Sequence, residues 1–319
     1  STSFRRSSVM PELIPPGRLV DAVDSSMRNV RGKPEDADTD IYWFSPRRLD
    51  TFRACPFAFF LQYALGIEEE DYETAYEDPL TAGMAVHRVF ELLFDRIGKE
   101  DGFFDPERIE AYRTIAGQAI DRAFEEYERG GEDLFSPEWR RLRRFLEDRT
   151  EEFLEVEART FPRFSVERTE ETYFRQIDGK IGLYGRVDRL SSLNGRPAVV
   201  DYKSGKAPTK KSFDSDEVPD ETQMPMYLLL TERPGRETAA VSYYSLKSGS
   251  YTHLVYDGPG EVKPSLGVER LAGLAERVTG AARKVRDAME AGNFVAPRAC
   301  DSCDFRSICR MKYSIRTRK

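Results

Sequence analysis

The chain has 319 residues, of which 39% are hydrophobic, and a formal net charge of −7. This length is enough for one large or two small domains with a hydrophobic core. No stretch approaches the roughly 18 consecutive apolar residues of a membrane helix, and the N-terminus lacks an apolar secretion signal. We therefore expect a cytoplasmic protein without membrane contact. The negative charge also argues against binding of nucleic acid through bulk attraction alone.

Residues 1–41 show no clear hydrophobic periodicity, and we expect them to form an extended arm or a linker. The stretch that follows, FSPRRLDTFRACPFAFFLQYALG, predicts helical structure. Ser45 is a candidate N-cap, Pro46 suits the first helical position, and Gly66 suits the stop. Pro56 is expected to break this segment into two helices, because proline removes a backbone hydrogen bond.

Three more helices are predicted before the strand-forming part of the chain. The segment 83–98, GMAVHRVFELLFDRIG, has apolar residues at helical spacing and carries His87. A second helix is capped at Asp105, and a third covers about 137–160. We expect residues from about 100 to 160 to form a helical insertion.

Beyond residue 160 the hydrophobic period shortens toward two, which predicts strands. TYFRQI, KIGLYGRVDRLS and PAVVDYKSG form three strands, separated by tight-turn sequences at 178–179 and 194–195. A helix around 222–232, a hairpin of TAAVSYYSLKSG and SYTHLVYDG, and a long helix at about 263–291 follow. This order of elements predicts an α+β fold.

Two carboxylates and a lysine are predicted to meet on this sheet. A turn at 194–195 places opposite each other residues whose numbers sum to about 389, so Asp188 faces Asp201. Alternation puts Lys203 on the face that carries Asp201. Opposed carboxylates repel unless a cation lies between them, and Mg²⁺ binds carboxylate and phosphate oxygens. The pattern predicts either a metal site acting on phosphate or ordinary ion pairs, Asp201–Lys203 and Asp188–Arg186, and spacing leaves both open.

Other candidate residues are ambiguous when each is taken alone. His87 is either a metal ligand or a core or surface histidine. Gln223 and Tyr227, four residues apart on one helix, can bind a phosphate or base or simply belong to an amphipathic helix. Near the C-terminus, C-x2-C-x5-C favours metal ligation over disulfides in a chain without an export signal.

Six motifs in this order resemble one family: RLDTFRACPFAFFLQYALGI, GMAVHRVFELLF, GRVDRL, VVDYKSGK, QMPMYLLL and CDSCDFRSIC. They cover residues 42–312 and are similar to RecB-type nucleases of the PD-(D/E)XK superfamily, in the subgroup with an iron–sulfur cluster. That subgroup includes AddB-like helicase–nuclease subunits and CRISPR-adaptation exonucleases. The resemblance implies a central mixed sheet flanked by helices, a Cys-rich end at 295–312, and a basic tail at 313–319.

The resemblance also implies roles for individual residues. His87, Asp188, Asp201 and the main-chain carbonyl of Tyr202 would bind the catalytic metal, Mg²⁺ or Mn²⁺, and Lys203 would be the catalytic lysine.

Two more residues, Gln223 and Tyr227, match the Gln-x-x-x-Tyr motif that helps to hold DNA near the cut site. Val187 stands where the superfamily name has proline, and an aspartate stands at 201 where many members have glutamate. Both departures are ordinary in the RecB branch.

The four cysteines match the family's iron–sulfur ligands in the same way. Cys55, Cys300, Cys303 and Cys309 would ligate a [4Fe–4S] cluster that staples the N- and C-terminal parts together. A structural Zn²⁺ bound by the same thiolates is the alternative.

The function implied is that of a metal-dependent deoxyribonuclease, an exonuclease acting on single strands or DNA ends in recombination and repair. Its partners would be DNA and the helicase domains or helicase partner chain of an AddB-like helicase–nuclease. The alternatives are a catalytically vestigial iron–sulfur clamp on DNA and a CRISPR-adaptation exonuclease.

Overall fold

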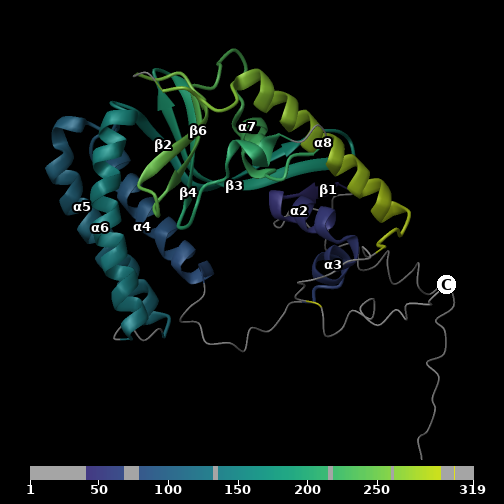
Figure 1. Ribbon diagram of the computed structural model, residues 1–319, viewed down its shortest axis with the longest axis horizontal. Coiled ribbons are helices and arrows are strands. Elements are labelled where there is room, and N and C mark those ends of the chain that lie inside the picture. Colours follow the sequence, from purple (N-terminus) through teal and green to yellow (C-terminus); the bar gives the residue numbers. More distant parts are fainter. Residues whose placement is uncertain are drawn as a thin grey trace, which may run out of the picture.

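The computed structural model describes residues 41–67, 79–131, 136–214, 218–259, 262–295 and 305. A six-stranded mixed sheet is covered by helices, which confirms the expected α+β class (Figure 1). In chain order the strands and α-helices are β1 (Tyr42–Phe44), α2 (Pro46–Ala54), α3 (Pro56–Phe59), α4 (Pro79–Glu100), α5 (Ile109–Arg129), α6 (Pro137–Thr160), β2 (Ser165–Gln176), β3 (Ile181–Leu193), β4 (Arg196–Lys203), α7 (Gln223–Thr231), β5 (Ala240–Ser245), β6 (Ser250–Tyr256) and α8 (Val268–Glu290).

The sheet has the order β1-β3-β4-β5-β6, and β2 pairs with β3 along its other edge. Strands β2, β3 and β4 form the predicted antiparallel meander, while β4–β5 and β1–β3 are parallel. Arg189 pairs with Val200, so the register sum of 389 is confirmed. Asn194 and Gly195 have φ values of 54° and 79°, as a two-residue hairpin turn requires.

Most element boundaries follow the sequence signals, with a few differences. Strand β2 begins at Ser165, seven residues before the predicted strand, and α4 begins at Pro79, four residues before the predicted start. The Ser45 side chain caps α2, and Cys55 lies at the joint before Pro56, as expected. Strand β1 was not predicted, because three residues that pair in parallel with a distant strand carry no turn signal. Helix α8 begins at Val268, five residues later than predicted, after Gly267 with a φ of 96°. No helix in the described ranges is long and apolar enough to cross a membrane.

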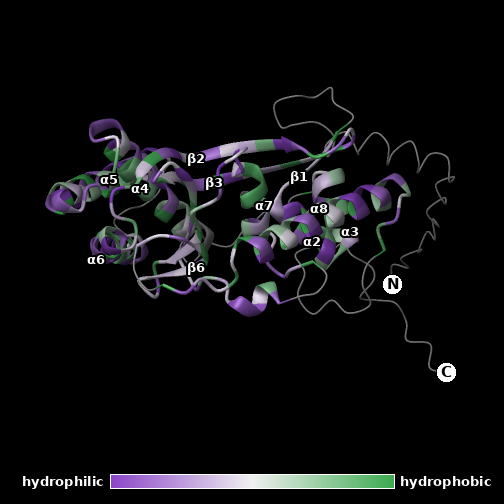
Figure 2. Cartoon of the chain, turned by 90° about the horizontal axis from the view of Figure 1, so that it is seen from above, coloured by the Kyte–Doolittle hydropathy of each residue, from purple (hydrophilic) through white to green (hydrophobic). Residues whose placement is uncertain are grey.

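Two hydrophobic cores lie on opposite faces of the sheet. Helices α4, α5 and α6 pack on one face, and α2, α7 and α8 pack on the other. Figure 2 shows these two groups gathered at opposite ends of the molecule, with β2 and β3 running between them. Strands β3, β4, β5 and β6 each contribute buried side chains to both cores.

A buried ion pair backs the meander on the α4–α6 side. Arg189 Nη2 lies 2.7 Å from Glu157 Oε1, and the two side chains are 1% and 0% exposed. The guanidinium carbon lies 4.3 Å from the ring centroid of Phe94 and 4.6 Å from that of Phe164. Removing one partner of such a pair leaves a buried charge without compensation.

Glu157→Leu should lower the free energy of unfolding by about 3–5 kcal/mol. The matched control is Glu155→Leu on the same helix, because Glu155 pairs with Arg113 and is 46% exposed. That change should cost at most about 1 kcal/mol. Urea denaturation measures both variants, and equal losses would show that the buried pair contributes no more than a surface pair.

Candidate active site

The site lies where strands β3 and β4 part. Arg189–Val200 is the last pair of their ladder, and beyond it the Asp188 carboxylate accepts a 2.8 Å hydrogen bond from the Tyr202 backbone N–H. Leu190 and Val199 belong to the α7–α8 core. Because side chains two residues apart on a strand share a face, Asp188 and Asp201 lie on that same face. The two carboxylates therefore share one face, as the register predicts.

The buried carboxylates impose a strong electrostatic constraint on each other. Asp188 is 5% exposed, and Asp201 is 1% exposed. Burial raises the pKa of Asp188 well above its usual 3.8, and the nearby charge of Asp201 raises it further. A bound cation would relieve both effects.

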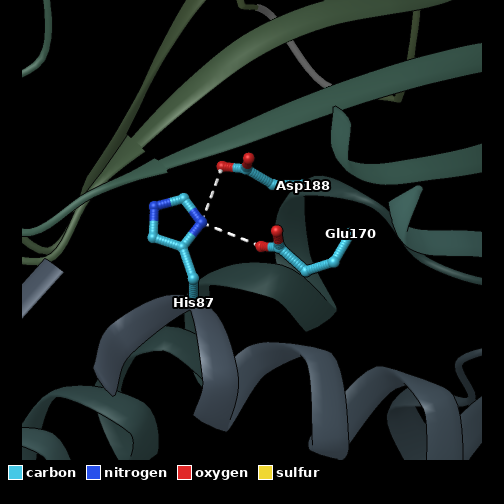
Figure 3. Close-up of side chains that lie close together, drawn as sticks. All are labelled: His87, Glu170 and Asp188. Atoms are coloured by element: carbon cyan, nitrogen blue, oxygen red, sulfur yellow. Dashed lines mark hydrogen bonds and ion pairs between the residues drawn. The ribbon is translucent and has the colours of Figure 1, made fainter. Parts of the chain in front are cut away.

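Helix α4 directs His87 at this pair of strands. His87 Nδ1 lies 2.8 Å from Glu170 Oε1 and 3.4 Å from Asp188 Oδ2 (Figure 3). Burial would lower the pKa of His87, but the hydrogen bond to Glu170 and the charges of Asp188, Glu170 and Asp201 outweigh it, raising the pKa from 6.5 to about 9. One ligand atom from each of His87, Glu170 and Asp188 lies within 4.8 Å of the others, close enough to hold a metal ion.

Lys203 is fixed on the other side of Asp201. Its Nζ lies 2.9 Å from Asp201 Oδ2 and donates a 2.8 Å hydrogen bond to Gln223 Oε1. Burial lowers the pKa of Lys203, but Asp201 more than offsets this, so the pKa rises above 10.5 and the side chain stays cationic at neutral pH. Of the two ion pairs expected from the sequence, Asp201–Lys203 forms, whereas Arg186 pairs with Glu170 at 2.9 Å.

Helix α7 organises these groups through Gln223 and Tyr227. Gln223 Nε2 donates to Asp201 Oδ1 at 2.7 Å and to the Tyr227 hydroxyl at 2.9 Å. Tyr227 is 4% exposed, and its hydroxyl donates to the Arg186 carbonyl. Both residues therefore belong to the same cluster as the carboxylates, and their contact with DNA stays a prediction.

Glu170 is the residue of this cluster that sequence reasoning missed. It lies before the predicted strand TYFRQI, and a two-residue turn at 178–179 gives a sum of 357, which would set Asp188 opposite Thr169. In the structure Gln176 pairs with Gly182, so residues opposite each other sum to 358. Applied to Asp188, that sum gives Glu170.

The second histidine is structural. His253 in β6 is 8% exposed, and its Nδ1 lies 2.7 Å from the Ser242 hydroxyl. Burial lowers the pKa of His253 to about 4, so it is neutral at physiological pH.

Of the four cysteines, Cys55 lies within the described residues, and Cys300, Cys303 and Cys309 lie outside them. Cys55 ends α2, and its sulfur accepts a hydrogen bond from the Ala58 N–H at 3.4 Å. Five residues later, the Phe60 ring packs 4.7 Å from that of Phe294, which precedes Cys300 by six residues. Phe294 therefore packs on the helical segment Phe60–Ala64, which begins five residues after Cys55.

Helix α2 also holds the segment that leads into α7. The Arg53 guanidinium donates to the Pro219 carbonyl and, at 2.9 Å, to the Asp220 carbonyl. The Thr222 hydroxyl lies 3.1 Å from both carboxylate oxygens of Asp50. Because Gln223 follows directly, these contacts fix where α7 begins.

Comparison with known proteins agrees with this geometry. Residues 43–310 match the PD-(D/E)XK nuclease superfamily, and the chain belongs to that superfamily.

Among curated proteins, the chain is 32% identical over 197 residues to a subunit of the ATP-dependent helicase/deoxyribonuclease of Streptococcus agalactiae serotype Ia, covering 58% of this chain and 16% of that protein. The proteins of the same name from Streptococcus mutans and Lachnoclostridium phytofermentans are 30% and 31% identical over 53% of this chain, and 14% and 15% of their own lengths are covered. The chain thus spans no more than 16% of the length of these relatives.

Asp50 should make stability depend on pH. Burial raises its pKa from 3.8 to about 6, although Thr222 and Arg53 oppose the shift. The folded state then keeps a proton that the unfolded state releases, so the free energy of unfolding should fall as pH rises from about 4 to 6. Asp50→Asn should flatten this slope in chemical denaturation, whereas the exposed control Asp214→Asn should keep it. An unchanged slope in Asp50→Asn would show that other groups cause it.

Proposed function

We propose that the chain is a divalent-metal-dependent deoxyribonuclease that hydrolyses phosphodiester bonds in single-stranded DNA or at duplex ends. The observation that carries the proposal is the convergence of Asp188 and Asp201 on one face of the sheet, with His87 and Lys203 beside them. Mg²⁺ and Mn²⁺ bind oxygen ligands, and the buried carboxylates of Asp188 and Asp201 supply such oxygens together with negative charge.

The donor set fits such an ion. His87, Asp188, Asp201 and the main-chain carbonyl of Tyr202 would hold it. When bound, the ion polarises a phosphate oxygen and lowers the pKa of water. Lys203, fixed by Asp201, is positioned to neutralise charge that develops on a phosphate.

Gln223 and Tyr227 complete the proposed site. Gln223 holds the side chains of Lys203 and Asp201 in place, since it hydrogen-bonds both of them. In the proposal it also holds DNA near the cut site, while Tyr227 fixes the orientation of its amide.

We place this activity in recombination and repair, as an exonuclease that works with a helicase. The support is that the relatives are named as subunits of an ATP-dependent helicase/deoxyribonuclease, and that this chain matches a small segment of each.

Asp201→Ala should lower Mg²⁺-dependent degradation of end-labelled DNA by about 100-fold or more, because it removes a metal ligand and frees Lys203. Chelation of the metal should abolish the activity of the wild type. The exposed control Asp214→Ala should retain full activity. Wild-type protein that cleaves no DNA with Mg²⁺ or Mn²⁺ would favour the vestigial clamp instead.

The same proposal includes a [4Fe–4S] cluster on Cys55, Cys300, Cys303 and Cys309. Its support is the packing of Phe294 on Phe60. Phe294 lies six residues before Cys300 in the sequence, and Phe60 lies in the helical segment that follows Cys55. A cluster there would anchor the end of α8 to α2, and through α2 the start of α7.

Anaerobically purified protein should therefore contain about four iron atoms per chain and absorb broadly in the visible range. Cys55→Ser should lose this absorption, because the cluster loses a thiolate, and should melt at a lower temperature. Colourless wild-type protein with one zinc per chain would replace the cluster by a structural zinc site.

A further inference from the structure

Arg186 lies on the solvent side of the carboxylate cluster. It precedes Asp188 by two residues on β3, and side chains two residues apart on a strand share a face. Its Nε lies 2.9 Å from Glu170 Oε2, while Glu170 Oε1 faces His87. The Arg186 side chain is 65% exposed and that of Glu170 is 9% exposed, so the guanidinium extends from a buried carboxylate into solvent.

Two contacts fix Arg186 in place. The Tyr227 hydroxyl donates to its main-chain carbonyl, and Glu170 holds its guanidinium. Within the described part of the chain, the Arg186 side chain has no ion pair or hydrogen bond besides the contact with Glu170. Most N–H donors of a guanidinium are on its Nη atoms. These donors are therefore open to a ligand that approaches from solvent.

DNA that approaches the site meets a row of three carboxylates. In the β2–β3 ladder, the residues on either side of Glu170 pair with those on either side of Asp188, so these two lie opposite each other, and Asp201 follows on β4. A cation stands at each end of this row, Arg186 beside Glu170 and Lys203 beside Asp201. A phosphate is attracted to these ends and repelled by the carboxylates between them.

The two cations are held on opposite sides of the row. Asp201 and Gln223 fix Lys203 on the β4 side, whereas Glu170 holds the Arg186 guanidinium on the β2 side. Neighbouring strands are about 4.8 Å apart, so β2 and β4 are separated by about 10 Å. This separation suits two phosphates of one strand better than a single phosphate. A guanidinium fits such a group, because its planar donors can bind two phosphate oxygens at once.

We propose that Arg186 binds the DNA phosphate next to the one that is cut, with Glu170 holding the guanidinium in position. Arg186 is then a substrate-binding residue on the β2 side of the site, and Lys203 serves the cleaved phosphate on the β4 side. The choice of DNA as ligand rests on the proposed nuclease function, and strand binding can be measured apart from cleavage.

The test measures binding of one strand and its cleavage separately. A fluorescently labelled single-stranded oligonucleotide is bound at several salt concentrations with Ca²⁺ in place of Mg²⁺, and KM and kcat are then measured with Mg²⁺. The variants are Arg186→Gln, Arg186→Lys and the matched control Arg168→Gln. Arg168 lies on the neighbouring strand, is 64% exposed, and pairs through its Nε with Glu171 at 3.2 Å.

Arg186→Gln should weaken binding about 10-fold or more, because charge-assisted hydrogen bonds to a phosphate are lost. The slope of log affinity against log salt should become shallower by about 0.7, the value for one phosphate contact on a single strand. KM should rise while kcat stays unchanged, since the contact is made equally before and during cleavage. Arg186→Lys keeps the charge but not the planar donors, so it should keep the slope and lose part of the affinity.

Arg168→Gln should bind the strand as the wild type does. Equal losses in Arg168→Gln and Arg186→Gln would show a general effect of surface charge and would overturn the proposal. Unchanged affinity and slope in Arg186→Gln, or a slope reduced as much in Arg186→Lys, would overturn it as well. A retained slope in Arg186→Lys excludes a folding defect as the cause.

Failure of the nuclease assignment gives a different result. Wild-type protein that binds the strand through Arg186 without cutting it would remove the proposed function and leave the phosphate contact standing. Cleavage by Arg186→Gln with an unchanged KM would do the reverse.

Discussion

The site depends on buried negative charge concentrated at the point where β3 and β4 part. Asp188 lies between Glu170 and Asp201, and both burial and repulsion raise its pKa. Such a cluster persists only if cations compensate it. His87 from α4 and Lys203 from β4 provide such charge, so helix and sheet must be correctly placed before the carboxylates can stay together.

The two layers of helices supply site residues that the strands do not carry. Helix α4 belongs to one core and contributes His87, whereas α7 belongs to the other and contributes Gln223. Arg189, which directly follows Asp188 in the sequence, forms a buried ion pair with Glu157 behind the strands. Contacts on both faces of the sheet thus fix the position of Asp188. The site can therefore be rigid although β3 and β4 no longer pair there.

Local sequence signals were sufficient for most of the fold and for part of the site. Turn residues at 194–195 set the register that brings Asp188 and Asp201 together, because a two-residue hairpin fixes pairing by geometry. Strand β1 and the contact between Glu170 and His87 could not be predicted from local sequence signals. Both join segments far apart in the chain, and no local pattern encodes which distant elements pack together.

The Asp201–Lys203 pair shows why a short motif leaves structural and functional explanations open. The ion pair expected of an ordinary strand end does form, at 2.9 Å. What distinguishes it is burial, since the Asp201 side chain is 1% exposed and Gln223 hydrogen-bonds both partners. A surface pair would be solvated and would contribute little. Here Lys203 is fixed beside a row of carboxylates, so the same contact that stabilises the strand end also places a cation where a phosphate would have to bind.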